Sequence, residues 1–201
     1  MKNCFYENEK KYATSDKSAE KMKNASGDGV LLSSIGEGET FKIGEREFIV
    51  CEHLEDEKTA VLLKDLLFEF QQFGINNNYN GSNVDQICNK FADEMEGLIG
   101  GALCEFSLDL TADDGLKCYG SIERKAALFT ANMCRKYVEI LDKCKIDKWW
   151  WTSTAYSTPK HDGSYWIKCV SPRGGIGSYD FNYDDGVRPF CILKSDIFVS
   201  K

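Results

Sequence analysis

Residues 40–51 alternate apolar and polar side chains, with Phe41 and Ile43 on one face. A period of two is typical of a strand with one buried face. A Gly-Glu pair separates this run from a second apolar run, so the segment predicts a β-hairpin. Residues 59–63 predict a third strand.

A period of three to four residues follows the Asn-rich turn at 76–81, after which Ser82 or Asn83 can cap a helix. One face of this helix is apolar, and the glycines within residues 97–101 are expected to end it. Its apolar positions are Val84, Ile87, Cys88, Phe91 and Met95.

Residues 125–129 predict a short strand, and Thr130 is expected to cap a second helix. The apolar stripe of that helix consists of Cys134, Tyr137, Val138 and Leu141. Both helices are therefore expected to pack on a sheet.

From Trp149 onward the period returns to two. The segments expected there are a strand at 165–170, a turn at 173–177, a second arm at 179–183 and a last buried strand at 190–193. The predicted fold class is α+β, with an early hairpin, two helices in the middle and an antiparallel C-terminal sheet. Residues 1–29 are polar and predict an N-terminal extension, and residues 30–201 are expected to form the domain.

Composition and charge restrict the class of binding partner. The 201 residues carry a net charge of -7, which argues against nucleic-acid and anionic-membrane surfaces. No apolar run approaches the roughly twenty residues that span a bilayer, and no signal peptide follows Met1. We expect a soluble protein that is cytoplasmic or virion-associated.

Cysteine spacing does not favour metal binding. The nine cysteines are odd in number and contain no C-x-x-C pair, so reduced thiols are expected. His53 and His161 lie far from each other and from any cysteine pair, which disfavours a zinc site. No metal and no cofactor are expected.

Groups for catalysis are also scarce. A nucleophilic constellation would need His53 or His161, but no nucleophile-elbow pattern accompanies either. The pairs at 113–114 and 184–185 both precede Gly, so turn formation explains them without acid-base chemistry. Asp184, Asp185 and Asn182 offer oxygen ligands for calcium, but a calcium site is not expected there. Cys169 has apolar neighbours typical of a buried thiol. We expect no enzyme.

The block Trp149, Trp150 and Trp151 is expected to alternate between two faces of a strand. If Trp150 is buried, the other two rings share the opposite face, and at least one of them should approach the surface. Arg188 is expected to anchor the final turn by hydrogen bonds to main-chain carbonyls.

Several strings resemble a family of bacterial and phage proteins whose signature is a C-terminal Trp-Trp pair and a terminal GVRP. They are TFKIGEREFIV, VLLKDLL, FGINNNY, ALFT, WWWTST, YWIKCVSPRGG and GVRPF, and the resemblance covers about residues 30–200. That family resembles the C-type-lectin-like fold of formylglycine-generating enzymes and of the variable proteins of diversity-generating retroelements. The resemblance implies two helices and small twisted antiparallel sheets whose final hairpin and loops present ligand contacts.

We therefore hypothesise a non-enzymatic ligand-binding domain, either phage-encoded or diversified by a retroelement. The segment 178–185 has the Tyr, Asn, Asp and Ser composition of adaptable recognition loops, and the loop 156–164 lies beside it. The candidate ligand-binding residues are Tyr156, His161, Tyr165, Arg173, Ser178, Tyr179, Asp180, Phe181, Asn182, Tyr183 and Asp184. The expected ligand is a protein or a carbohydrate.

Two alternatives remain open at the level of sequence. One is a thiol or metal enzyme related to formylglycine-generating enzymes, which would need Cys169 and Cys191 exposed and close together. The other is a structural subunit of a phage particle, with a homo-oligomer or a particle protein as partner.

Overall fold

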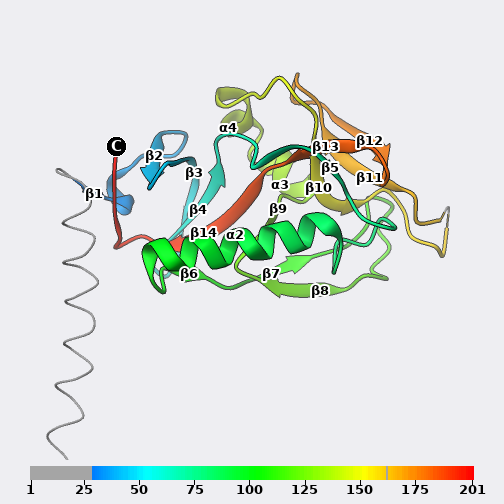
Figure 1. The fold of residues 1–201 in the computed structure, drawn as a ribbon, viewed down its shortest axis with the longest axis horizontal. Coiled ribbons are helices and arrows are strands. Elements are labelled where there is room, and N and C mark those ends of the chain that lie inside the picture. Colours follow the sequence, from blue (N-terminus) through cyan, green and yellow to red (C-terminus); the bar gives the residue numbers. More distant parts are fainter. Residues whose placement is uncertain (1–28, 162) are drawn as a thin grey trace, which may run out of the picture.

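The computed structural model describes residues 29–161 and 163–201, so the predicted extension 1–29 lies, apart from Gly29, outside the described residues. The described part is an α+β fold of small sheets and three α-helices, which confirms the predicted class (Figure 1). The helices are α2 (Asn83–Ile99), α3 (Ala131–Lys136) and α4 (Val138–Lys143), and a 3-10 turn covers Leu32–Ser34.

Helix α2 begins and ends where local signals place it. The Ser82 hydroxyl caps the helix by accepting a hydrogen bond from the Asp85 amide at 3.2 Å. At the other end Gly100 adopts a left-handed φ of 43°, a conformation that glycine reaches without strain. The helix continues through Gly97, which therefore does not end it.

The predicted second helix is two short helices instead of one. Thr130 caps α3 as expected, accepting from the Met133 amide at 3.0 Å. At Tyr137 the backbone leaves the helical region, with φ −103° and ψ 28°, and α4 starts at Val138. The stripe is therefore wrong at Val138, which is 50% exposed, whereas Ile140 and Leu141 face the core.

The larger sheet contains the predicted hairpin, the third strand and the last buried strand. Its strands are β2 (Thr40–Ile43), β3 (Arg46–Leu54), β4 (Lys58–Leu63), β14 (Pro189–Lys194), β6 (Leu103–Cys104) and β9 (Ala126–Leu128). Strand β14 is central, since it pairs with β4 on one edge and with β6 and β9 on the other. Its Phe190 is aligned with Leu62 and Ala127.

The second sheet carries the C-terminal segments. In spatial order its strands are β12 (Ile176–Asp180), β11 (Trp166–Val170), β10 (Trp150–Ala155), β13 (Asp184–Val187) and β5 (Phe68–Gln72). The expectation of an all-antiparallel sheet is wrong at one pair, because β13 runs parallel to β10. The chain crosses from β12 to the far side of β10, where the Gly186 amide donates to the Trp149 oxygen at 2.8 Å.

Two further pairs of short strands complete the fold. They are β1 (Val30–Leu31) with β15 (Phe198–Val199) and β7 (Phe106–Asp109) with β8 (Ser121–Arg124). The two larger sheets are joined by Arg188, the only residue between β13 and β14. A nearly continuous length of chain therefore supplies one strand to each sheet.

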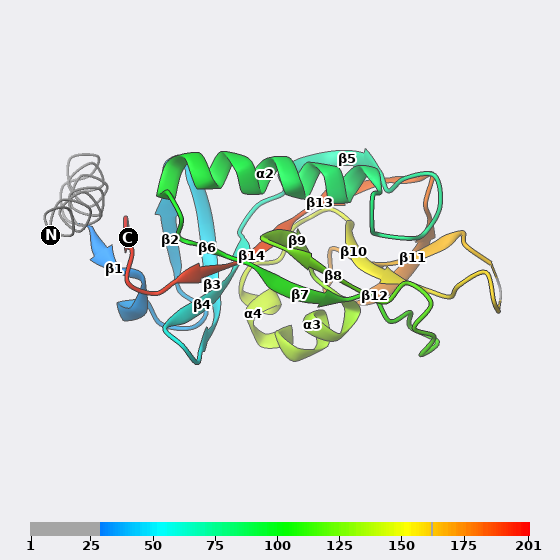
Figure 2. The same ribbon diagram turned by 90° about the horizontal axis from the view of Figure 1, so that it is seen from below.

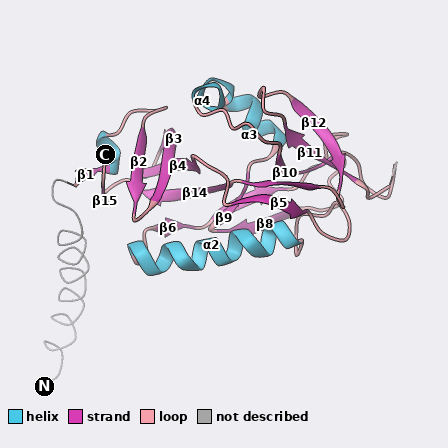
Figure 3. Ribbon diagram, turned by 45° about the horizontal axis from the view of Figure 1, so that its top comes forward, coloured by secondary structure: helices cyan, strands magenta, loops and turns pink. Residues whose placement is uncertain are grey.

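The sheets lie between helices on two sides. Figure 2 shows α2 along the long axis on one side and α3 with α4 on the other, and Figure 3 shows α2 passing both sheets. Strand β10 is buried throughout, so its side chains pack on both faces of the sheet. Trp150 packs with residues of α3 and α4, whereas Trp151 packs in the core on the opposite face, together with half-buried Trp149. The predicted alternation of the three rings is confirmed.

None of the helices in residues 29–161 and 163–201 has the length and apolar character needed to cross a membrane.

Candidate binding site

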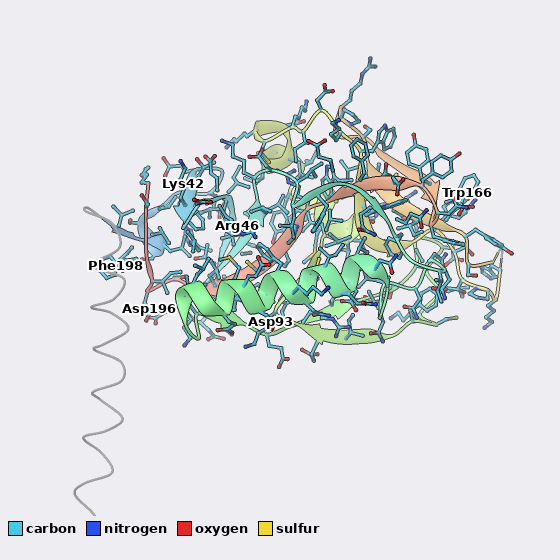
Figure 4. The ribbon with its side chains drawn as sticks, in the orientation of Figure 1. Lys42, Arg46, Asp93, Trp166, Asp196 and Phe198 are labelled. Carbon is cyan, nitrogen blue, oxygen red and sulfur yellow. The ribbon has the colours of Figure 1, made fainter. Side chains whose placement is uncertain are left out.

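Three exposed aromatic side chains meet where the chain enters β11. Tyr156 is 43%, Tyr165 57% and Trp166 53% exposed. Together with Ser157 and Gly163 they line a hollow of about 270 Å³, which we call the aromatic hollow. Figure 4 labels Trp166 at the end of the molecule opposite Phe198.

The rings are arranged in contact pairs. The centroids of Tyr156 and Trp166 are 6.0 Å apart with planes at 51°, and Tyr165 stacks on Phe181 with centroids 6.3 Å apart. The Lys168 ammonium lies 5.5 Å from the Tyr156 centroid, within the range of a cation–π contact. Each of the three exposed rings therefore contacts a neighbouring side chain, while about half of its surface remains exposed.

A second hollow of about 470 Å³ adjoins the first and shares Tyr156 and Ser157 with it. We call it the polar hollow, because its other lining residues are Asp113, Asp114, Lys160 and His161. Figure 4 shows the stick side chains of this end of the molecule around Trp166. The candidate site is therefore an apolar surface beside a charged one.

Both carboxylates of the polar hollow are paired within the protein. Asp113 accepts from Arg135 at 3.0 Å and forms an ion pair with Lys168 at 3.2 Å. Burial raises the pKa of Asp113, but the hydrogen bonds from Arg135 and Lys168 outweigh burial and hold the pKa below its ordinary value. The carboxylate therefore stays ionised, and both of its oxygens are paired with cations of the protein.

Asp114 is engaged through both of its oxygens. Oδ1 accepts from the Leu116 amide at 3.0 Å, and Oδ2 accepts from the Ser157 hydroxyl at 2.8 Å and lies 3.1 Å from His161 Nδ1. Desolvation raises the pKa of Asp114, and these hydrogen bonds lower it to a value below the ordinary one. The predicted turn at this Asp pair is confirmed by the Gly115 amide, which donates to the Ala112 oxygen at 2.8 Å.

Ser157, Asp114 and His161 thus come together, although the sequence offered no such pattern. The carboxylate lies between the hydroxyl and the imidazole. A serine nucleophile needs the imidazole next to the hydroxyl and the carboxylate behind the imidazole. The order found here, with the carboxylate in the middle, differs from that arrangement.

Asn77 fixes the loop that carries the rings, and sequence reasoning missed it. Its buried amide nitrogen donates to the main-chain oxygens of Ser157 at 2.8 Å and Trp166 at 3.0 Å. Its side-chain oxygen accepts from the Tyr119 hydroxyl at 2.7 Å, and its own amide donates to the Ser164 oxygen at 3.0 Å. The only signal was the Asn-rich string before α2, which indicates a turn.

The sequence-predicted site residues occupy three places. Tyr156, His161 and Tyr165 gather at the two hollows. Arg173 is exposed in the β11–β12 turn, where neighbouring Gly174 faces Asp142 of α4. In the hairpin, Ser178, Tyr179, Asp180 and Phe181 are half-buried, whereas Asn182, Tyr183 and Asp184 are exposed. The hairpin side chains do not line either hollow.

The hairpin carries an aromatic stack of its own. Tyr179 packs edge-on against Trp149 with ring centroids 4.8 Å apart, and Tyr183 stacks on Tyr179 at 5.4 Å. Tyr179 is therefore part of the packing, and only Tyr183 offers most of its surface to solvent.

Asp185 corrects the interpretation of residues 184–185 as a turn. Both residues belong to strand β13, and the turn covers 181–183. Asp185 is 7% exposed, and its Oδ2 is buried without a hydrogen-bond partner in the described part of the chain. Burial, with a smaller contribution from Asp184, raises the pKa of Asp185 to about 6.

The candidate thiols are inaccessible. Cys169 and Cys191 are fully buried and belong to different sheets. Burial raises the pKa of Cys169 to about 12, so its thiol stays protonated near neutral pH. Within residues 29–161 and 163–201, no group of three or more His, Cys, Asp or Glu side chains is placed to hold a metal ion.

The accessible chemistry of this end of the molecule is thus three aromatic rings beside two paired carboxylates and the ammonium of Lys160. Comparisons with known proteins found no matching family model, no matching curated protein and no matching solved structure.

Proposed function

We propose that this chain is a recognition domain that binds a ligand in the aromatic hollow without transforming it. The observation that carries the proposal is the exposure of Tyr156, Tyr165 and Trp166 around one hollow of about 270 Å³. Large apolar side chains are usually buried, and a cluster of exposed ones marks a contact surface. Tyr and Trp also dominate the energy of protein recognition sites.

The rigidity of the support favours the same proposal. The loop is tied at Ser157, Ser164 and Trp166 by the single side chain and amide of Asn77. A preformed surface loses little conformational entropy when a ligand binds. The frame is proposed to be C-type-lectin-like, with the exposed hairpin residues 182–184 as a second contact region that can vary.

Catalysis has less support. The Ser157 hydroxyl is directed to a carboxylate, and burial holds the Cys169 thiol protonated near neutral pH. A thiol enzyme of the formylglycine-generating kind needs two accessible sulfurs, and Cys169 and Cys191 are both buried.

Peptide and glycan arrays probed with the chain test the proposal. We expect each retained ligand to lose at least about tenfold in affinity in Trp166→Ala and Tyr165→Ala, because the contact rings are removed. The matched control is Phe198→Ala, which removes an exposed ring at the opposite end of the molecule (Figure 4). Folded Trp166→Ala and Tyr165→Ala proteins that retain every ligand would contradict a site in this hollow.

A further inference from the structure

We infer that the ligand of the aromatic hollow is an uncharged, proline-rich peptide segment in the polyproline II conformation. The inference rests on the proposed function, since it names the class of ligand for the same site. Three properties of the site support it: the free hydrogen-bonding groups of the hollow, the paired carboxylates beside it and its exposed ring faces.

The free polar atoms on the rings can all donate. The indole N–H of Trp166 is a donor only, and the hydroxyls of Tyr156 and Tyr165 donate as well as accept. Within the described part of the chain these three groups have no hydrogen-bond partner. They match a ligand that is rich in acceptors.

The strong acceptors of the polar hollow are already occupied. Both oxygens of Asp113 accept from cationic side chains, and both oxygens of Asp114 accept from the protein. The hydroxyls of a sugar donate as well as accept, and their donors would find these carboxylates already paired. A polyproline II segment exposes all its carbonyl oxygens, and proline has no N–H to satisfy.

The side chains beside the hollow disfavour a cationic ligand. Asp113 lies between the cations Arg135 and Lys168, and the ammonium of Lys160 also lines the polar hollow. The Lys168 ammonium already lies against the Tyr156 ring, so a second cation there would be repelled. The aromatic faces are thus left for uncharged apolar groups.

Proline rings suit the exposed faces. Grooves lined by Tyr and Trp bind polyproline II helices, whose fixed backbone is ordered before binding. The tilt of 51° between Tyr156 and Trp166 gives two inclined walls, and Tyr165 forms a third. The ligand and the loop held by Asn77 are therefore both preorganised.

The test uses peptides of about ten residues, one of proline and one of alternating Gly and Ser, with binding measured by calorimetry. We expect the proline peptide to bind at least about tenfold more tightly than the Gly-Ser peptide, and its affinity to change little between about 0.05 and 0.5 M salt. Equal binding of the two peptides, or none of the proline peptide, overturns the inference.

Variants separate the contributions of the ring and its donor. Trp166→Phe keeps an aromatic face but loses the indole N–H, and we expect a loss of about fivefold in affinity for the proline peptide. Trp166→Ala should lose about tenfold or more, and Phe198→Ala should match the wild type. Binding that is unaffected in Trp166→Ala places the peptide elsewhere and contradicts the inference.

Neutral oligosaccharides and tetramethylammonium are the other two probes, tested for binding to the wild type and to Trp166→Ala. If either binds, is lost in Trp166→Ala and outcompetes the proline peptide, the ligand class is wrong while the proposed function stands. If no probe and no array ligand depends on Trp166, the proposed function fails as well.

Discussion

The side-chain amide of Asn77 donates a hydrogen bond to the main-chain oxygen of Trp166 across 3.0 Å, although the two residues are 89 positions apart. The same nitrogen donates to the Ser157 oxygen at 2.8 Å. One buried side chain thereby fixes both ends of the loop that lines the aromatic hollow. The geometry of the hollow depends on a residue that does not line it.

Replacing Asn77 with Ala should therefore affect both stability and the loop. Two main-chain oxygens and the Tyr119 hydroxyl would lose a partner, and we expect the free energy of unfolding to fall by about 2–4 kcal/mol. Urea unfolding measures the loss, and hydrogen exchange should be faster in the loop. Asn78→Ala is the control, since among residues 29–161 and 163–201 its side chain has one hydrogen bond, accepted from the Asn80 amide. Equal effects of the two substitutions would contradict a specific role for Asn77.

Asp185 should make the protein less stable as the pH rises. Its folded pKa of about 6 lies above the ordinary value of 3.8, so the native state binds the proton more tightly than the unfolded chain. The contribution of this one carboxyl to stability should fall from about pH 4 to about pH 6 and then stay level. The groups that interact with this carboxyl are Asp184, Cys169 and Tyr179.

The variant Asp185→Asn removes this titration. It should exceed the wild type in free energy of unfolding by about 1–3 kcal/mol near pH 7, and the difference should vanish below about pH 4. Urea unfolding over a pH series gives the curve, with the exposed Asp65→Asn as control. A constant difference at all pH values would show that ionisation of Asp185 is not the cause.

Substitutions of Tyr179 and Tyr183 should differ in their effect on stability, because one ring is packed and the other is exposed. Tyr179 contacts Trp149, so Tyr179→Ala should cost about 1–2 kcal/mol of stability, whereas Tyr183→Ala should change it by less than about 0.5 kcal/mol. Thermal and urea unfolding of both variants test this difference. A loss in Tyr183→Ala as large as that in Tyr179→Ala would show that the exposed ring also carries the fold.

Arg188 should be among the most sensitive positions for stability. Its guanidinium is 1% exposed, donates to the oxygens of Leu63, Lys64 and Cys144, and lies 5.4 Å from the centre of the Trp150 ring. Arg188→Met should cost about 3–5 kcal/mol, because these carbonyls would be left buried and unpaired.

The control for this substitution is Arg173→Ala, in the exposed turn, which should change stability by less than about 0.5 kcal/mol. Both variants can be compared by urea unfolding. An Arg188→Met protein as stable as the wild type would mean that the carbonyls find other donors.

Local features of the fold were predictable from the sequence. The hairpin at 40–51 and the Ser82 cap depend on neighbouring residues, and both are where the pattern places them. The break at Tyr137 was not predictable, because the periodicity runs on through Val138. The parallel pairing of β10 with β13 depends on a contact between Trp149 and Gly186, and no local pattern encodes it.

The candidate site was predictable only in part. Tyr156, His161 and Tyr165 stand close together in the sequence and meet in the structure. Asn77 and Asp113 come from distant segments, and their roles arise from long-range hydrogen bonds and ion pairs. Composition also gave the hairpin a uniform surface character, whereas every residue of β12 is half-buried in the sheet.

Since Arg188 alone separates β13 from β14, pulling on either strand transmits force directly into the other sheet. In a partly unfolded state with one sheet intact, the boundary between ordered and disordered chain would have to fall at Arg188. Proteolysis or truncation near the carboxyl end should therefore leave no stable fragment, and heat should melt both halves in a single step.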